Sequence, residues 1–464
     1  IMYGGWSGTS ITMTIRRIPW LRHTPKGGGE PIYLALAQAL ETAIRSGELQ
    51  PGDQLPPQRT VAALMGVDLT TVTRAYGVAR SRGLVEGAVG RGTFVRRLAV
   101  EDEVGLVDLS MNLPPQPKGP SFAASLKATT AEVLQRTDTA TLMAYHPGLG
   151  ALGQRAGGAA WLAPVLGEVA PERVQVCPGA QAALSALVWS LVGRGGTLVV
   201  EPLTYPGMLA IAEQVGVRLV ACPTDAEGLA PDALASICRE ERPAALYVIP
   251  TMQNPTGVTM PLARRQAIAQ VATDHDFWII EDDPYSRLMA EPLAGLATLA
   301  PERTFHIATL SKCLAPGLRL AFLVAPEGDR GAPAVEAVHS LAGMPAPLMS
   351  AVVASWIRDG TAEALLAGVR AEAAERRAMA AARLPAAQGS PEAIHVWLPL
   401  PADWSPVRLR AAAKDRGLAL VSAEAFAVGT MAANGVRISL GAPGRQEVLA
   451  EALAGVAGLL GEAR

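Results

Sequence analysis

The stretch Thr309-Leu310-Ser311-Lys312, continued by Ala315-Pro316-Gly317-Leu318-Arg319, follows an apolar run that begins at Thr304 and is typical of a buried strand. The lysine stands between this run and a Pro-Gly break, and the arginine comes seven positions later. A lysine with nearby hydroxyl groups can hold an aldehyde cofactor as a Schiff base, and an arginine can clamp a phosphate. A Ser-Lys pair before a turn is usually only a solvated loop, so this interpretation depends on the rest of the chain.

Further short apolar runs surround this stretch and alternate with helical patterns. Continuous apolar strands between helices predict an α/β fold with a mostly parallel, buried sheet. Ligands bind such sheets at the carboxyl ends of the strands. A chain of 464 residues is also long enough for two or three domains. The predicted strands are residues 198–200, 218–220, 246–249, 277–280, 305–307 and 321–324.

Polar side chains follow three of these strands. Tyr205 can stack on a flat heterocycle, Asn254 can donate to a phenolate oxygen, and a carboxylate of Glu281-Asp282-Asp283 can keep a pyridine nitrogen protonated. Each also has a simpler interpretation, as a packed loop residue, a turn residue or a helix cap. Considered singly, these simpler interpretations are favoured.

Two further segments can bind anions. Gly179-Ala180-Gln181 is a glycine turn that opens a helix, where exposed amides suit a phosphate. Arg437 lies in an apolar strand, where an arginine usually extends its charged end to solvent, although it can also pair with a substrate carboxylate.

In this order and at these separations, the segments resemble the fold-type I pyridoxal-phosphate family, aminotransferase class I, over about residues 107–464. The resemblance implies pyridoxal 5'-phosphate as cofactor, Lys312 as the Schiff-base lysine and Asp282 as the partner of the pyridine nitrogen. It implies Arg437 as the residue that binds the carboxylate of an effector or substrate. The remaining residues that it implies in cofactor binding are Gly179, Ala180, Gln181, Tyr205, Asn254, Tyr285, Thr309, Ser311, Arg319 and, from a neighbouring subunit, Tyr145.

The chain before this region predicts a winged helix-turn-helix. Helical patterns run from Ile32 to about Gly47, from Gln58 to Met65 and from about Thr70 to Arg82, and two short strands follow around the turn from Gly87 to Gly92. A small helical cap with a solvated polar face is the alternative. The side chains expected to face DNA are Arg59, Thr70, Thr71, Thr73, Arg74 and, at the tip of the wing, Arg91.

This segment resembles the GntR family of bacterial regulators. The motifs are Gly47-x-Leu49-x-Pro51-Gly52-x-x-Leu55-Pro56, Thr71-Val72-x-Arg74-Ala75-Tyr76 and Gly90-x-Gly92-Thr93-Phe94-Val95. Joined to an aminotransferase-like region, it resembles the MocR family, which implies a regulator that senses an amine, an amino acid or the cofactor itself and dimerises head to tail. An active aminotransferase with an accessory DNA-binding module is the main alternative, and a scaffold that binds neither cofactor nor effector is a third. The predicted domains are a flexible tail at 1–29, the DNA-binding domain at 30–97, a linker and arm at 98–120, and the cofactor-binding domain at 121–464.

Composition narrows the class of protein further. A net charge of −2 shows no global attraction to nucleic acid or anionic membranes, so any basic surface is local. The four cysteines form no CxxC pair, which predicts a reduced, cytosolic protein without disulfides or a bound metal. No apolar run is long enough to span a bilayer, and no secretory signal is visible.

Overall fold

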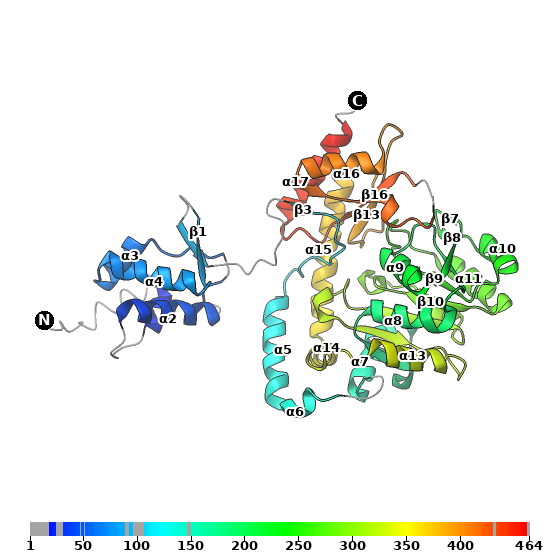
Figure 1. The fold of residues 1–464 in the computed structure, drawn as a ribbon, viewed down its shortest axis with the longest axis horizontal. Helices are drawn as coiled ribbons and strands as arrows, with labels where there is room; N and C mark the ends of the chain where they lie inside the picture. The colour runs from blue at the N-terminus through cyan, green and yellow to red at the C-terminus, as the bar shows by residue number, and fades with distance from the viewer. Residues whose placement is uncertain are drawn as a thin grey trace. The chain divides into compact units, whose positions relative to one another are not determined.

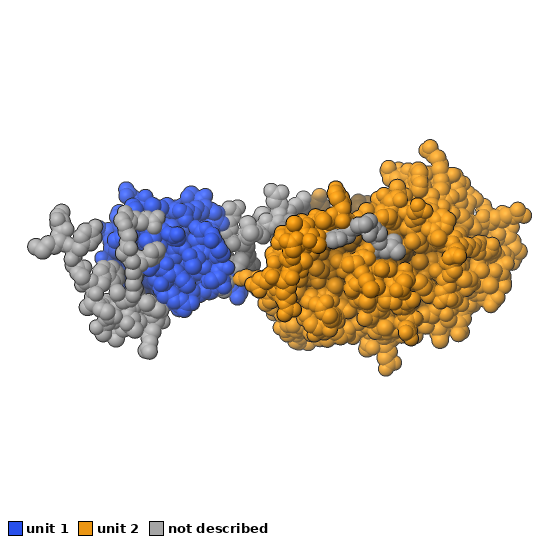
Figure 2. All heavy atoms as spheres, turned by 90° about the horizontal axis from the view of Figure 1, so that it is seen from below, with its two compact units in different colours: residues 1–104 blue, residues 105–464 orange. Residues whose placement is uncertain are grey.

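The computed structural model describes residues 18–24, 31–46, 48–50, 52–88, 92–95, 106–145, 150–429 and 433–461. The chain divides into two compact units, residues 1–104 and 105–464 (Figure 2). Each unit encloses apolar cores of its own. No helix in these described ranges is both long and apolar enough to cross a membrane.

The first unit is the predicted winged helix-turn-helix (Figure 1). Its helices bury the apolar positions that repeat along them, including Leu36, Leu40, Val61 and Val72. The Tyr76 hydroxyl donates to the carbonyl oxygen of Pro56 at 2.8 Å and so ties the third helix to the preceding loop. The elements are α2 (Ile32–Arg45), α3 (Gln58–Met65), α4 (Leu69–Ser81) and the antiparallel pair β1 (Val85–Ala88) and β2 (Gly92–Val95).

The prediction of a flexible tail over residues 1–29 is wrong for residues 18–24. A short 3-10 helix, η1 (Pro19–His23), packs against α2, and Ile18, Trp20 and Leu21 are buried in the core of the first unit. Three apolar side chains in a polar stretch show no helical or strand period, although their burial is favourable wherever a core accepts them. Residues 1–17 and 25–30 lie outside the described part of the chain.

A seven-stranded sheet forms the centre of the second unit. The mostly parallel sheet expected from the apolar runs is confirmed, and the first strand in space, β4, had not been predicted. Only β12 among these seven strands runs antiparallel to its neighbours. In spatial order the strands are β4 (Val174–Cys177), β12 (Ala321–Val324), β11 (Thr304–Thr309), β10 (Trp278–Asp282), β9 (Ala245–Val248), β5 (Thr197–Val200) and β6 (Arg218–Ala221).

Both faces of this sheet are covered by helices (Figure 1). Because successive side chains of a strand point to opposite faces, Leu198 and Tyr247 enter one core whereas Val199 and Leu246 enter another. The first core includes residues of α7 (Leu152–Leu166), α8 (Ala180–Leu187), α13 (Ala332–Ala342) and α14 (Pro347–Asp359), and the second includes residues of α10 (Pro231–Glu241), α11 (Leu262–His275) and α12 (Leu296–Leu299).

A smaller antiparallel sheet lies toward the C-terminal end of the chain. It has its own core, which includes Val396, Ile438 and Leu449. Its strands are β13 (His395–Pro399), β16 (Gly435–Ser439) and β15 (Val421–Ser422), and its helices are α15 (Thr361–Arg383), α16 (Pro406–Asp415) and α17 (Gln446–Gly461). The other elements of this unit include α5 (Phe122–Arg136), α6 (Thr139–Leu142), α9 (Pro206–Val215), β7 (Thr224–Asp225) and β8 (Gly228–Leu229).

The segment before α5 is part of the second unit, which therefore begins earlier than the predicted boundary at 121. We call residues 106–113 the arm. Its strand β3 (Val107–Asp108) pairs in parallel with β14 (Leu418–Ala419), and the Ser439 amide donates to the carbonyl oxygen of Leu109 at 2.8 Å. A two-residue strand is too short to show an alternating pattern, so the sequence indicated only a linker followed by an extended segment. Residues 96–105 lie outside the described part of the chain.

Candidate functional site

A pocket of about 390 Å³ opens at the carboxyl edge of the large sheet. Asp282 ends β10, Thr309 ends β11 and Asn254 follows β9, so the parallel strands bring these residues together. Arg319 reaches the same edge for a different reason. It precedes β12, and an antiparallel strand begins where its neighbours end.

Lys312 is partly buried in this pocket. Its Nζ donates to the carbonyl oxygen of Asn112 at 2.5 Å. Burial lowers the pKa of the Lys312 ammonium to about 8, helped by the Arg437 charge and opposed by Asp282. The neutral, nucleophilic form of this amine is therefore more populated near neutral pH than in an ordinary lysine.

Asp282 is a buried carboxylate that lacks one of its expected partners. Its Oδ2 accepts a hydrogen bond from the Tyr247 hydroxyl at 2.7 Å. Its Oδ1 is also buried, and no described residue bonds to it. Burial raises the pKa of Asp282 to about 6, and the neighbouring Asp283 contributes to the increase. Because a buried polar atom is costly without a partner, this oxygen fits a donor that enters the pocket, such as a protonated ring nitrogen.

The start of α8 and the Arg319 side chain form one end of the pocket. Gly179 has φ +97°, and a Cβ built on it would lie 2.9 Å from the Arg319 guanidinium, so a larger residue does not fit there. No side chain caps the first amides of α8. Open helix amides beside an arginine fit a phosphate. Thr309 and Ser311 add hydroxyl groups whose oxygens are 2.9 Å apart.

Tyr205 and Gln181 lie next to this end. The Gln181 Nε2 donates to the carbonyl oxygen of Gly207 at 3.1 Å. A Cβ on Gly207 would lie 2.3 Å from the Tyr205 ring, so the ring packs directly on this glycine. Tyr205 is partly buried, and burial raises the pKa of its hydroxyl. A ring held in this way can stack on a flat ligand.

Arg437 is buried and lines the same pocket as Lys312. Its Nη1 donates to Asn254 Oδ1 at 2.8 Å, and its Nη2 donates to the carbonyl oxygen of Ser110. No described residue bonds to its Nε. Burial lowers the pKa of this guanidinium. Lys312 and Arg437 are thus each held by a backbone carbonyl of the arm.

Sequence reasoning missed several residues in and next to this pocket. Ser110 and Asn112 lie on the arm, and Tyr247 lies within β9. Asn112 Nδ2 donates to the hydroxyl oxygen of the buried Tyr285 at 2.9 Å. Tyr285 had been predicted from the sequence, but 173 positions separate it from Asn112. No local pattern connects residues so far apart.

Tyr145 lies apart from the pocket of its own chain. Its side chain is 92% exposed, and residues 146–149 that follow it are outside the described ranges. The structure therefore does not bring it together with Lys312 within one subunit.

The predicted DNA-facing side chains follow α3 and α4. Thr70, Thr73 and Arg74 are exposed, and Thr71 is partly buried. The Thr73 hydroxyl is already bonded within the protein, 2.8 Å from Gln58 Oε1. Arg91 lies outside the described residues.

Arg59 and Arg74 are the two described arginines predicted to touch DNA. Arg59 stands in the first turn of α3 and is exposed, like Arg74 on α4. Neither has an ion-pair or hydrogen-bond partner among the described residues. The pair leaves two cations free on one small domain, which suits contact with a polyanion.

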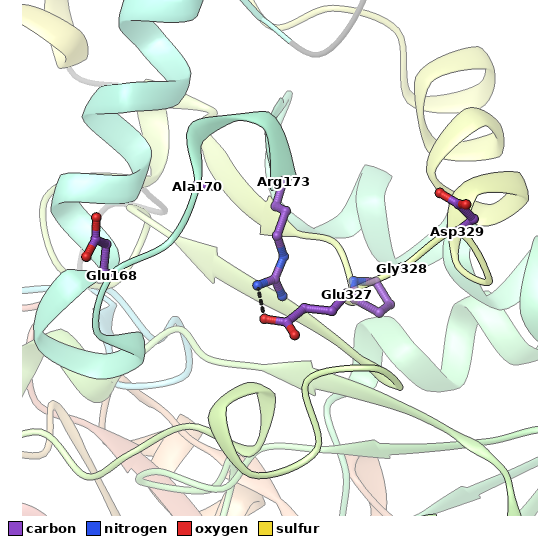
Figure 3. Close-up of a pocket in the computed structure, with 7 residues that line it drawn as sticks. Glu168, Ala170, Arg173, Glu327, Gly328 and Asp329 are labelled. Atoms are coloured by element: carbon purple, nitrogen blue, oxygen red, sulfur yellow. Dashed lines mark hydrogen bonds and ion pairs between the residues drawn. The ribbon is translucent and has the colours of Figure 1, made fainter.

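A second hollow, of about 550 Å³, lies on the surface beside β4 and β12 (Figure 3). Arg173 donates to Glu327 at 2.8 Å and to the carbonyl oxygen of Ala325 at 2.9 Å. Glu168 and Asp329 are the other charged residues that line it. The arginine is already paired, so this hollow carries no arrangement that indicates a ligand.

Comparison with known proteins assigns the two units to families. The family described as aminotransferase class I and II matches residues 104–456, and the bacterial regulatory proteins of the gntR family match residues 32–95. The chain is 30% identical over 436 residues to the uncharacterized HTH-type transcriptional regulator YdeF of Bacillus subtilis, across 91% of this chain and 93% of the relative. The chain belongs to the HTH-type transcriptional regulators that carry an aminotransferase class I domain.

Other relatives agree with this family. The probable rhizopine catabolism regulatory protein MocR of Rhizobium meliloti is 30% identical over 381 residues, which cover 75% of this chain and 76% of that protein. Among solved structures, the alpha-aminoadipate aminotransferase LysN of Thermus thermophilus, in complex with N-(5'-phosphopyridoxyl)-L-leucine, has a TM-score of 0.69 and 25% identity. That similarity covers 83% of this chain and 98% of LysN. The predicted fold-type I transferase fold and the predicted regulator family are both confirmed.

Proposed function

We propose that this regulator binds operator DNA through its first unit, and pyridoxal 5'-phosphate (PLP) with a small amine or amino-acid effector through its second. The observation that carries the proposal is that Asp282 and Lys312 line the same pocket. One is a buried carboxylate with a free oxygen, and the other is an amine with a pKa of about 8 in the same pocket. These two groups match the ring nitrogen and the aldehyde of PLP.

When bound, PLP supplies an aldehyde that takes up primary amines and a ring that accepts electrons. Lys312 would provide the nitrogen that holds it, and Asp282 would keep a proton on the ring nitrogen. Asn254 accepts from Arg437 through Oδ1, which leaves its Nδ2 free to donate to the phenolic oxygen. Tyr285 also lines the pocket and would face that oxygen.

The other residues of the site would hold the phosphate of PLP and cover its ring. Gly179 and Ala180 offer backbone amides to the phosphate, and Tyr205 would cover the ring. The other residues assigned to the phosphate end are Gln181, Thr309, Ser311 and Arg319.

The arm links effector binding to the DNA-binding unit. A carboxylate on Arg437 competes with the Ser110 carbonyl, and the aldehyde on Lys312 competes with the Asn112 carbonyl. Occupancy of the pocket therefore changes what holds the arm, and the chain continues from the arm through residues 96–105 into the first unit. A ligand shifts a conformational equilibrium only by its differential affinity for the two states.

The size of the required shift limits what Arg437 can contribute. Moving a population from 1:99 to 99:1 requires about 5.5 kcal/mol. A charge-assisted hydrogen-bonded pair contributes about 1.5–3 kcal/mol. Arg437 alone is insufficient, so rearrangement of the arm must contribute the remainder.

DNA binding and dimerisation complete the proposal. Thr70, Thr71, Thr73 and Arg74 on α4 would enter the major groove, while Arg59 and Arg91 would contact phosphates. The exposure of Tyr145 supports a head-to-tail dimer in which it reaches the phosphate of the neighbouring subunit. A twofold dimer would present two DNA-binding units to two half-sites.

The test is an absorption spectrum of purified protein supplemented with PLP and titrated with amino acids and amines, with operator affinity measured in the same preparation. We expect visible absorption, an adduct on Lys312 after borohydride reduction, and at least one amine that changes both the spectrum and the DNA affinity. Absence of a reducible lysine adduct contradicts the cofactor assignment. Rapid transamination, with DNA affinity indifferent to every amine, would instead favour an active aminotransferase, which the lowered pKa of Lys312 permits.

A further inference from the structure

His395 lies at the start of β13 and is fully buried. Its Nε2 is 3.2 Å from the carbonyl oxygen of Gln253. A carbonyl oxygen only accepts hydrogen bonds, so Nε2 must carry a proton. Burial lowers the pKa of this imidazole to about 3, with a further contribution from the nearby Arg437 and Lys312 charges. The ring is therefore neutral, and its Nδ1 has no proton.

The Asn112 side chain contacts this unprotonated nitrogen. One amide atom of Asn112 lies 3.2 Å from His395 Nδ1 and 2.9 Å from the Tyr285 hydroxyl oxygen. Because Nδ1 can only accept, the amide atom that faces it is the nitrogen, which has one hydrogen for each partner. The Asn112 Oδ1 then faces away, is buried, and has no partner among the described residues.

The direction of these bonds determines the role of the Tyr285 hydroxyl. Since this oxygen accepts from Asn112, its own hydrogen is not used in that bond. The hydroxyl makes no second hydrogen bond within the described part of the chain, and Tyr285 lines the pocket. Besides Asn112, the groups that act on this hydroxyl are Arg437, Asp282 and Tyr205.

We propose that Gln253, His395, Asn112 and Tyr285 form a hydrogen-bond relay of fixed direction, in which Asn112 is the positioning residue. The relay turns the Tyr285 hydrogen into the pocket as a donor to the phenolic oxygen of PLP. This inference rests on the proposed function. It adds a residue of the arm, Asn112, that acts on the bound ring through Tyr285.

The relay is tested by the visible absorption of the bound cofactor as a function of pH. Asn112→Ala removes the hydrogen bond that makes Tyr285 a strong donor. The deprotonated form of the bound cofactor is then less stabilised. We expect the pH midpoint of the change in cofactor absorption to rise by about half a pH unit. Asn112→Asp places an acceptor against both His395 Nδ1 and the Tyr285 oxygen and adds a negative charge, so its upward shift should be larger. Gln116→Ala, an exposed site farther along the same extended segment, is the matched control and should match the wild type.

The outcomes separate the relay from the proposed function. A wild type that acquires no PLP absorption refutes the proposed function. A wild type that titrates normally, with both Asn112 variants superimposed on it, refutes the relay alone.

A measurement on the wild type covers the case in which the variants do not fold. Histidine-selective ¹⁵N spectra should show a neutral ring with its proton on Nε2 that does not titrate between about pH 5 and 8. Absence of any such signal among the six histidines overturns the relay.

Discussion

Two functional cations of the first unit and two of the second are held in opposite ways. In the first unit, Arg59 and Arg74 are exposed and have no partner among the described residues. In the second unit, Lys312 is partly buried, Arg437 is buried, and each is held by a backbone carbonyl of the arm. Water solvates an exposed cation without further help, whereas a buried cation is costly unless polar groups surround it.

This difference predicts different modes of ligand binding. A polyanion can contact the first unit with no protein bond broken, so its binding should depend strongly on salt. A ligand that binds Lys312 or Arg437 must displace Asn112 or Ser110 from that cation, so its binding should be selective, weakly screened and coupled to movement of the arm. The predictions below test this contrast, from the largest expected effect to the smallest.

Lys312→Ala should abolish the covalent link to PLP completely, because no other lysine among the described residues lines the pocket. Mass spectrometry after borohydride reduction measures this loss. Lys127→Ala, at an exposed lysine on α5, is the control and should retain the adduct. A reducible adduct that persists in Lys312→Ala would place the attachment site elsewhere.

Arg437→Ala should weaken binding of an amino-acid effector by about 10–150-fold, which corresponds to a charge-assisted pair of about 1.5–3 kcal/mol. Cofactor absorption and basal DNA binding should remain, so the effector response is what disappears. Spectral titration with the effector and an operator-binding assay measure both quantities. Arg408→Ala, at an exposed arginine of α16, is the matched control. An unchanged titration would exclude Arg437 from the effector site.

Arg74→Ala should weaken operator binding by about 1–3 kcal/mol and relax specificity at one base position. Fluorescence anisotropy with the operator and single-base variants measures both effects. Arg45→Ala is the control, because Arg45 is exposed in the same unit but already paired with Glu41 at 2.6 Å. If Arg74→Ala binds like the wild type, α4 is not the helix that reads the groove.

Capture of PLP by the apoprotein should depend on pH through Lys312. The neutral amine is the reactive form, and its share grows as pH rises through the lowered pKa of about 8. Between pH 7 and 9 the rate should therefore increase about tenfold and then level. Stopped-flow absorbance measures this rate of PLP capture. A rate that is still rising above pH 10 would show that the amine keeps its ordinary pKa.

Arg59→Ala should produce the smallest effect, a uniform loss of DNA affinity across sequences. The slope of log affinity against log salt should flatten by about one unit, since one phosphate contact is removed. Effector binding in the same protein should not change its salt dependence. A sequence-selective loss would instead place Arg59 on a base edge.

Much of this architecture was predictable from local patterns. The apolar runs at 198–200 and 321–324 lie within strands, the run at 246–249 overlaps β9, and the helix from Gln58 to Met65 has the predicted bounds. Asn254 and Asp282 were found because the carboxyl ends of parallel strands meet at one edge. Lys312 was placed by its position after a strand and by the family resemblance.

Other features had no local signal. The direction of β12, which puts Arg319 in the pocket, depends on its neighbours in the sheet. The burial of Trp20 depends on a core formed by helices that follow it.

The sequence alone determined which elements form and which side chains at their ends can do chemistry, because apolar periodicity, glycine turns and polar residues at strand ends act over a few neighbouring positions. Only the tertiary structure decided that the arm supplies carbonyls to Lys312 and Arg437, and that Asn112 lies between His395 and Tyr285, which are 283 and 173 positions away in the chain. Contacts across such separations arise from packing of the complete sheet and of the arm against it, and no short stretch of the chain specifies them.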